Sequence, residues 1–189
     1  MMPKSYVRLT DDVAAPGRWH LRSPTDSTGQ DVDPWCFTNG APVPEPGRLR
    51  LPVARAGKAL DFTLTGLAIP VVHVRVAAVF LEHAPGGVQV FPVEIQGQPD
   101  QYCILVATQT IRCIDDKACR EVEPWLPEDG RPEKTGEYRD VDGLRIDVAK
   151  VGDAQVFRTW GWTVALIVSD TLKEALARAG TTGMSFVEV

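Results

Sequence analysis

Residues 163–189 read TVALIVSDTLKEALARAGTTGMSFVEV and carry the clearest folding pattern in the chain. The run Val164–Val168 is short, apolar and rich in β-branched residues, which favours a buried strand over a helix. Asp170 is a suitable N-cap for a helix over Thr171–Ala179, where apolar residues recur every three or four positions. A glycine follows this helix, and Met184–Val189 is typical of a last strand. The stretch therefore predicts a strand, a helix and a strand that pack together.

The residues just before this stretch extend the predicted unit to 144–189. Leu144–Asp147 and Val156–Trp162 have the composition of strands, and Gly152-Asp153 forms a turn between them. Trp160 and Trp162 are two positions apart, so we expect both indoles on one face of the second strand. Such a pair either packs against the core or forms a platform for a sugar or a partner protein.

The central region, 48–114, alternates strand-like and helix-like patterns. The spacing of its apolar residues predicts a helix over Val74–His83. Pro92 indicates a sheet edge or a bulge, because proline cannot donate a hydrogen bond to a neighbouring strand. Strands are predicted near Arg48–Val53, Leu60–Thr65, Val88–Ile95, Gln101–Ala107 and Thr108–Ile114, the last two being apolar enough for a central position as separate strands or one bent strand. We expect one α+β domain over residues 1–189, with a mixed or mostly antiparallel sheet and two short helices.

Residues 1–47 are predicted to form a coil-rich wrap. Seven of the chain's 15 prolines lie between Pro3 and Pro46, which excludes long regular elements. Trp19, Trp35 and Phe37 are nevertheless large apolar side chains, unlike the composition of a disordered arm. We therefore expect these three rings to anchor an ordered coil on the core.

Residues 115–143 form an acidic segment between two predicted core strands. It holds ten acidic and five basic residues, and this excess of five equals the net charge of −5 of the whole chain. Three prolines and three glycines lie among them. We expect an exposed, irregular excursion, and a connection of this length within a compact domain is usually functional or mobile.

The bulk composition excludes several classes of function. A net charge of −5 argues against a general nucleic-acid binder or a protein that binds anionic membranes, because both need a basic surface. Neither an apolar run long enough to cross a membrane nor the apolar core of a signal peptide is found. The four cysteines form no CxxC pair, which favours reduced thiols and a cytoplasmic protein.

Candidate catalytic groups are few. Asp115 and Asp116 follow an apolar strand, where carboxylates can bind a metal or transfer protons. The histidines, His20, His73 and His83, have no metal-ligand spacing, and no phosphate-binding loop or nucleophile elbow occurs. A solvated strand end is the simpler interpretation of the aspartate pair, so we predict no cofactor, no bound metal and no enzyme activity.

The order of several short motifs resembles the Immunity Protein eleven family, which bacteria encode beside polymorphic toxins. The resemblance covers nearly the whole chain. His73 stands where the family pattern has a serine that caps a helix. The motifs are Tyr6–Leu9, Pro16–His20, Asp33–Phe37, Leu60–Phe62, Pro70–Val72, Ile111–Asp116, Leu144–Asp147, Val156–Arg158, Ile167–Ser169 and Thr182-Gly183.

This resemblance implies a small cytoplasmic protein that binds a cognate toxin and blocks it without catalysis. Many such toxins act on nucleic acids and are basic, so the acidic segment would steer their association. The residues that we expect to contact the toxin are Asp115, Asp116, Glu121, Glu123, Glu128, Asp129, Trp160 and Trp162. Two alternatives stay open: a small metal-dependent enzyme that uses Asp115 and Asp116 with a histidine, and an oligomeric scaffold that uses the Trp160 and Trp162 face.

Overall fold

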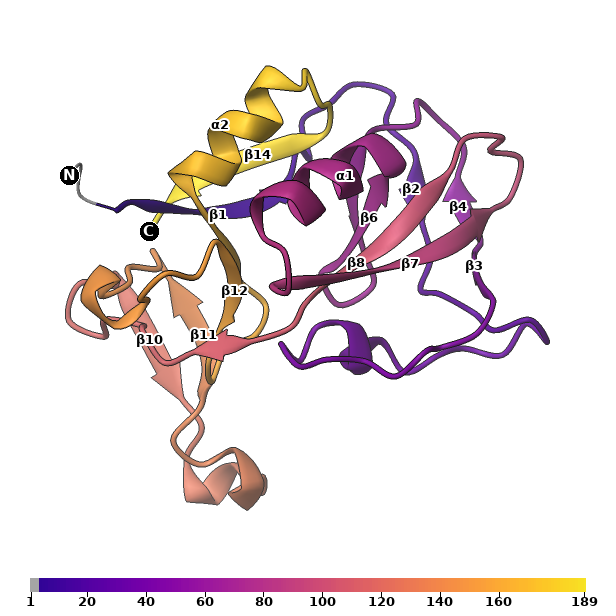
Figure 1. The fold of residues 1–189 in the computed structure, drawn as a ribbon. Coiled ribbons are helices and arrows are strands. Elements are labelled where there is room, and N and C mark those ends of the chain that lie inside the picture. Colours follow the sequence, from indigo (N-terminus) through magenta and orange to yellow (C-terminus); the bar gives the residue numbers. More distant parts are fainter. Residues whose placement is uncertain (1–3) are drawn as a thin grey trace.

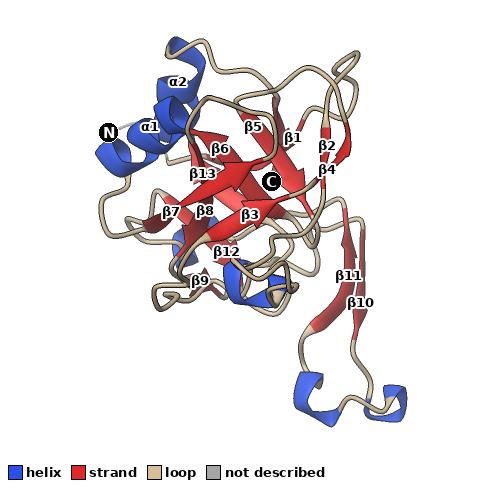
Figure 2. Ribbon diagram, turned by 90° about the vertical axis from the view of Figure 1, so that its right-hand side faces the viewer, coloured by secondary structure: helices blue, strands red, loops and turns tan. Residues whose placement is uncertain are grey.

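The computed structural model of the chain describes residues 4–189, so the first three residues of the predicted N-terminal wrap lie outside it. Its strands form two five-stranded sheets and two smaller ribbons (Figures 1 and 2). The first sheet has the order β14 (Met184–Glu188), β1 (Tyr6–Asp11), β13 (Leu166–Ser169), β12 (Val156–Thr159) and β9 (Thr110–Ile111). The second has the order β3 (Leu49–Leu51), β7 (Val88–Ile95), β8 (Tyr102–Ala107), β6 (Ile69–His73) and β5 (Phe62–Thr65).

Each sheet is antiparallel except for one pair at its edge, β9 with β12 and β3 with β7. The helices are α1 (Val74–His83) and α2 (Asp170–Arg178), which lie side by side in Figure 1. One ribbon pairs β2 (His20–Leu21) with β4 (Val53–Arg55), and the other pairs β10 (Glu121–Pro124) with β11 (Tyr138–Asp142). Short 3-10 turns are η1 (Pro34–Phe37), η2 (Pro127–Asp129), η3 (Pro132–Lys134) and η4 (Val148–Lys150). The predicted α+β class is confirmed, with the strands divided between two sheets.

The main core joins both sheets to both helices. Leu9 of β1, Phe80 of α1, Leu105 of β8, Leu166 of β13 and Leu172 of α2 belong to one buried cluster. The helices therefore close the space in which the two sheets meet. Because they are too short to be stable alone, burial of their apolar side chains stabilises them.

A second cluster covers the opposite face of the sheet that contains β8. All six residues of β8 are buried, and Ile104 and Val106 point away from the main core into this cluster. Trp19 and Phe37 of the N-terminal coil cover them there, at 4% and 0% exposure, as expected. Trp35 was expected to be a third anchor. This prediction is wrong, because Trp35 lies in η1 and is 50% exposed.

Several element boundaries follow the sequence pattern, but two strand predictions are wrong. Leu144–Asp147 forms no strand, and Thr108–Ile114 contains only β9, at the edge of its sheet. Helix α1 and strand β7 have the predicted bounds, and β8 is central. Pro92 lies where β7 pairs only with β8, because β3 pairs with β7 from Val93 onward. Proline at that position therefore interrupts no ladder on the open side. The region 48–55 forms two short strands, β3 and β4, instead of one.

The helix caps show one correction and one confirmation. Asp170 is not the N-cap of α2: the cap is Ser169, whose hydroxyl accepts a hydrogen bond from the Leu172 amide at 3.2 Å. Asp170 lies in the first turn, where a carboxylate still favours the helix dipole. His73 caps α1 in the position of the expected serine, and its Nδ1 accepts from the Arg75 amide at 3.2 Å.

Candidate partner-binding site

Residues 115–143 form an arm that projects from the body of the protein. Strands β10 and β11 make its stem, and η2 and η3 lie at its tip, away from both large sheets (Figures 1 and 2). The arm is thus an ordered ribbon with a folded tip, where the sequence predicted an irregular excursion. An exposed, protruding element of this kind can contact a partner without disturbing the core.

The base of the arm is fixed to the body by hydrogen bonds. The Tyr138 amide donates to the Gly161 carbonyl at 3.0 Å, and the Tyr138 hydroxyl donates to the Asp116 carboxylate at 2.5 Å. Two effects raise the pKa of the Tyr138 hydroxyl: burial of the ring is the larger, and the hydrogen bond to the Asp116 carboxylate is the second. Asp115 instead holds the turn before β10, because its carboxylate accepts from the Lys117 and Ala118 amides at 3.1 and 3.3 Å. The two aspartates therefore shape the base of the arm.

The register of the ribbon gathers carboxylates on one face. Directly opposed residues share a face, and Val122 opposes Val141, which is buried in the cluster beneath the arm. The other face carries two opposed acidic pairs, Glu121 with Asp142 and Glu123 with Asp140. We call these four residues the carboxylate face. Like charges that oppose each other across strands destabilise a sheet, so this face lowers the stability of the free protein.

Arginines compensate the carboxylate face only in part. Arg120 contacts Asp142 at 2.9 Å, and Arg139 contacts Glu123 at 2.7 Å. Within residues 4–189, Glu121 and Asp140 form no ion pair. At the tip, Asp129 accepts from the Leu126 amide at 2.8 Å and lies 3.9 Å from Arg139, whereas Glu128 is exposed and unpaired among the described residues.

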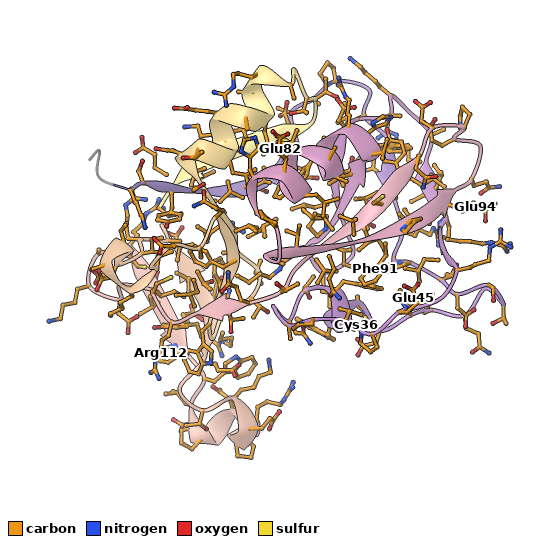
Figure 3. All side chains as sticks on the ribbon, viewed as in Figure 1. Cys36, Glu45, Glu82, Phe91, Glu94 and Arg112 are labelled. Atoms are coloured by element: carbon orange, nitrogen blue, oxygen red, sulfur yellow. The ribbon has the colours of Figure 1, made fainter. Side chains whose placement is uncertain are left out.

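The two tryptophans predicted on one strand face lie in a turn instead. Strand β12 ends at Thr159, and Gly161 has a φ of 81°, which is the left-handed region. Trp162 turns inward and is 8% exposed, with the Arg8 guanidinium 5.0 Å from its ring centre. Trp160 is partly exposed, and Arg112 lies over it at 4.4 Å. Figure 3 labels Arg112 where the arm joins the body.

Four of the chain's five tryptophans line one groove. The groove lies between the arm and the body and has a volume of about 690 Å³. Trp160 and Trp162 form part of its wall, together with Trp35 from η1 and Trp125 from the arm. We call this the tryptophan groove. Trp35 and Trp125 were not predicted as site residues, because nothing in their spacing indicates that they meet.

The groove also carries basic groups from the tip of the arm. Its charged lining residues are Arg131, Lys134, Arg139 and Glu137. Lys134 lies 5.8 Å from the Trp35 ring and 6.0 Å from the Trp125 ring, and Arg131 lies 5.9 Å from Trp125. Cations at these distances from an indole face are attracted to it. Lys134 thus links the tip of the arm to Trp35 of η1, whereas the contacts with Trp125 lie within the arm.

A buried arginine supports the wall of the groove formed by Thr163 and Val164. Arg158 is 0% exposed and donates to the carbonyls of Thr163, Val164 and Ala68 at 2.8, 3.2 and 3.0 Å. Burial is the main cause that lowers the pKa of the Arg158 guanidinium to about 10, and the positive charge of Arg8 is the second. Its Nε has no partner among the described groups. The arginine therefore ties strand β12 to two loops at a substantial desolvation cost.

The residues of the metal-enzyme alternative do not converge. His20 lies on β2, His73 caps α1, and His83 ends that helix. Within residues 4–189, no three His, Cys, Asp or Glu side chains form a group that could hold a metal ion. The cysteines are all unpaired, and burial raises the pKa of the Cys113 thiol to about 11, which makes it a poor nucleophile.

Two comparisons with known proteins address the family to which the chain belongs. The model of the immunity protein family (Imm11) matches residues 3–189, whereas a search of curated proteins finds no match. In addition, no helix in the described part of the chain is both long and apolar enough to cross a membrane. The family match spans essentially the whole chain and agrees with the resemblance drawn from its short motifs. The chain therefore belongs to the immunity protein family (Imm11).

Proposed function

We propose that this chain is a bacterial cytoplasmic immunity protein that binds a cognate polymorphic toxin and blocks it without catalysis. The observation that carries the proposal is the family match over residues 3–189. An inhibitor of this kind needs a stable scaffold and a complementary surface rather than a reactive centre. The two-sheet body and its projecting arm are suited to that task.

The carboxylate face supports the arm as the contact surface. Opposed carboxylates cost stability in the free protein, and a basic partner would convert that repulsion into attraction. We propose that the toxin contacts Glu121 and Glu123 on this face and Glu128 at the tip. Association should then be fast at low ionic strength and slower as salt screens the charges.

The decisive experiment is co-expression. The toxin domain encoded beside this chain would be produced alone and together with it, and the pair would then be co-purified. Rescue of growth with a stable complex is the expected result. Toxicity that this chain does not relieve, or the absence of a complex, would contradict the proposed function.

Charge reversal then tests the surface. The double variant Glu121→Lys/Glu123→Lys should lower the association rate and its dependence on salt. Because Glu123 pairs with Arg139, a second variant, Glu121→Lys/Glu128→Lys, makes the same change in net charge and leaves that pair intact. The matched control is Glu45→Lys/Glu82→Lys, since both residues are exposed and lie on the body, away from the arm (Figure 3). Equal association rates for all three variants would refute a role for the carboxylate face.

A further inference from the structure

Lys134 lines the tryptophan groove beside two of its indole rings. Its ammonium lies 5.8 Å from the centre of the Trp35 ring and 6.0 Å from the centre of the Trp125 ring. The nearest carboxylate, that of Glu137, is 3.9 Å away, which is beyond hydrogen-bond distance. The ammonium has three donors, and within residues 4–189 none of them forms a hydrogen bond. The two rings therefore fix a cation whose donors are free for another molecule.

The other two basic groups of the groove are already engaged. Arg139 donates to Glu123 at 2.7 Å, and Arg131 donates to Glu133 at 2.7 Å. Carboxylates beside the groove therefore neutralise both arginines, and Lys134 is the basic group of the lining that donates no hydrogen bond within residues 4–189. The Lys134 ammonium is thus a cation without a hydrogen-bonded partner, opposite in charge to the carboxylate face on the stem.

We propose that the tryptophan groove receives an extended segment of the toxin in which a carboxylate side chain stands beside an apolar or aromatic one. The carboxylate pairs with Lys134, and the neighbouring side chain packs against Trp35 and Trp125. This inference rests on the proposed function and adds a second contact to it. Tryptophan, tyrosine and arginine, which dominate the groove, are also the residues that most often carry binding energy at protein interfaces.

Two contacts of opposite sign would make the arm more selective for its partner than an acidic face alone. A basic patch on any protein is attracted to the carboxylate face, but it is repelled at Lys134. A partner must therefore present two features: a basic surface that meets the carboxylate face, and an acidic segment that reaches Lys134 at the same time. A toxin that lacks the acidic segment would bind weakly and with no fixed orientation.

Reversing the charge of Lys134 tests this inference, with the affinity of the purified protein for the toxin as the measurement. Lys134→Glu and Lys117→Glu make the same change in net charge within the arm, but Lys117 is exposed and does not line the groove. If a general acidic character drives binding, both variants bind the toxin as tightly as the wild type or more tightly. If the groove receives a carboxylate, Lys134→Glu weakens the complex by roughly tenfold or more, whereas Lys117→Glu does not.

A second variant, Trp35→Ala, tests the apolar part of the contact. Trp35 is half exposed on η1, outside the arm, so its removal should leave the fold and the carboxylate face intact. We expect at least a roughly tenfold loss of affinity in titration calorimetry, as for a buried tryptophan anchor. Circular dichroism and the melting temperature of each free variant would verify that it is folded.

The possible outcomes separate this inference from the function on which it rests. If the wild type fails to bind the toxin, both fall. If the wild type binds, and Lys134→Glu and Trp35→Ala bind equally well, the groove is not a contact while the immunity function stands. Loss of affinity in both variants, with Lys117→Glu unaffected, supports the groove as the site of an acidic toxin segment.

Discussion

Replacing Glu121 by lysine should stabilise the free protein, because the carboxylate face opposes like charges. In the β10–β11 ribbon, Glu121 lies directly opposite Asp142, and Glu123 lies opposite Asp140. A cross-strand pair of opposite charge contributes about 0.2–1 kcal/mol, whereas a like-charged pair is destabilising. The substitution turns one repulsive pair into an attractive one.

The size of the gain follows from the surroundings of Asp142. Arg120 already contacts this carboxylate at 2.9 Å, and the residues are exposed, so part of the repulsion is compensated and screened. We therefore expect about 0.5 kcal/mol for Glu121→Lys, in the lower half of the range, which corresponds to a rise of about 1–2 °C in Tm for a chain of this size. Glu121→Gln removes the repulsion without adding attraction, and it should give about half of that gain.

Thermal unfolding at low salt and at about 0.5 M NaCl would measure the effect, because added salt should shrink a gain of electrostatic origin. Glu45→Lys, in the exposed coil of the body, controls for the change in net charge. A Tm for Glu121→Lys that is unchanged or lower, or a gain that salt does not reduce, would refute the reasoning about the carboxylate face. The same variant should bind the toxin less well, which would show that stability is sacrificed for binding at this face.

Three further predictions concern the support of the site. Arg158→Met should lower the free energy of unfolding by about 1–6 kcal/mol. Three hydrogen bonds from a charged donor are lost, at about 1.5–3 kcal/mol each, and removal of the buried charge offsets part of this loss. Urea denaturation measures this, and a variant as stable as the wild type would show that the buried cation is replaceable. Gly161→Ala should cost about 1–3 kcal/mol, because Gly161 has a φ of 81° and a Cβ there would lie 3.2 Å from the Tyr138 ring. Hydrogen exchange should then quicken in the arm first, and exchange that quickens equally throughout would contradict this. Cys113, whose pKa burial raises to about 11, should resist alkylation at pH 8 in the folded protein, and its contribution to stability is present below pH 9 and is lost as pH rises toward 11. Mass spectrometry after iodoacetamide treatment would check the labelling, and rapid modification of Cys113 in the folded state would contradict the assignment.

The sequence was sufficient for elements whose pattern is local. Helix α1 and strand β7 have the predicted bounds, because apolar spacing and the flanking glycine and proline residues act within a few positions. The central position of β8 also follows from its unbroken apolar composition. Both residue types can cap a helix, but Ser169 has the extended backbone of an N-cap, with φ −69° and ψ 156°, whereas Asp170 is the first residue of α2.

The candidate site could not be predicted in the same way, because its parts are distant in sequence. The acidic segment was found from its composition, but the carboxylate face depends on the register of β10 with β11. The prediction of two indoles on one strand face failed at Gly161, whose positive φ ends the strand and turns Trp162 inward. Trp35 and Trp125 reach the groove from η1 and the arm, and no local pattern reports that they meet there.

The arm separates the chemistry of binding from the chemistry of folding. It adds to the buried clusters at its base, chiefly through Val122, Val141 and Tyr138, whereas the carboxylate face and Lys134 lie outside all three clusters. Substitutions on that face or at the tip therefore change the charge presented to a partner by whole units while altering the core little. Loss of toxin binding in such a variant, with Tm close to that of the wild type, would thus report on the contact itself. This is why charge reversal on the arm is a stricter test of the proposed function than any substitution in the two-sheet body.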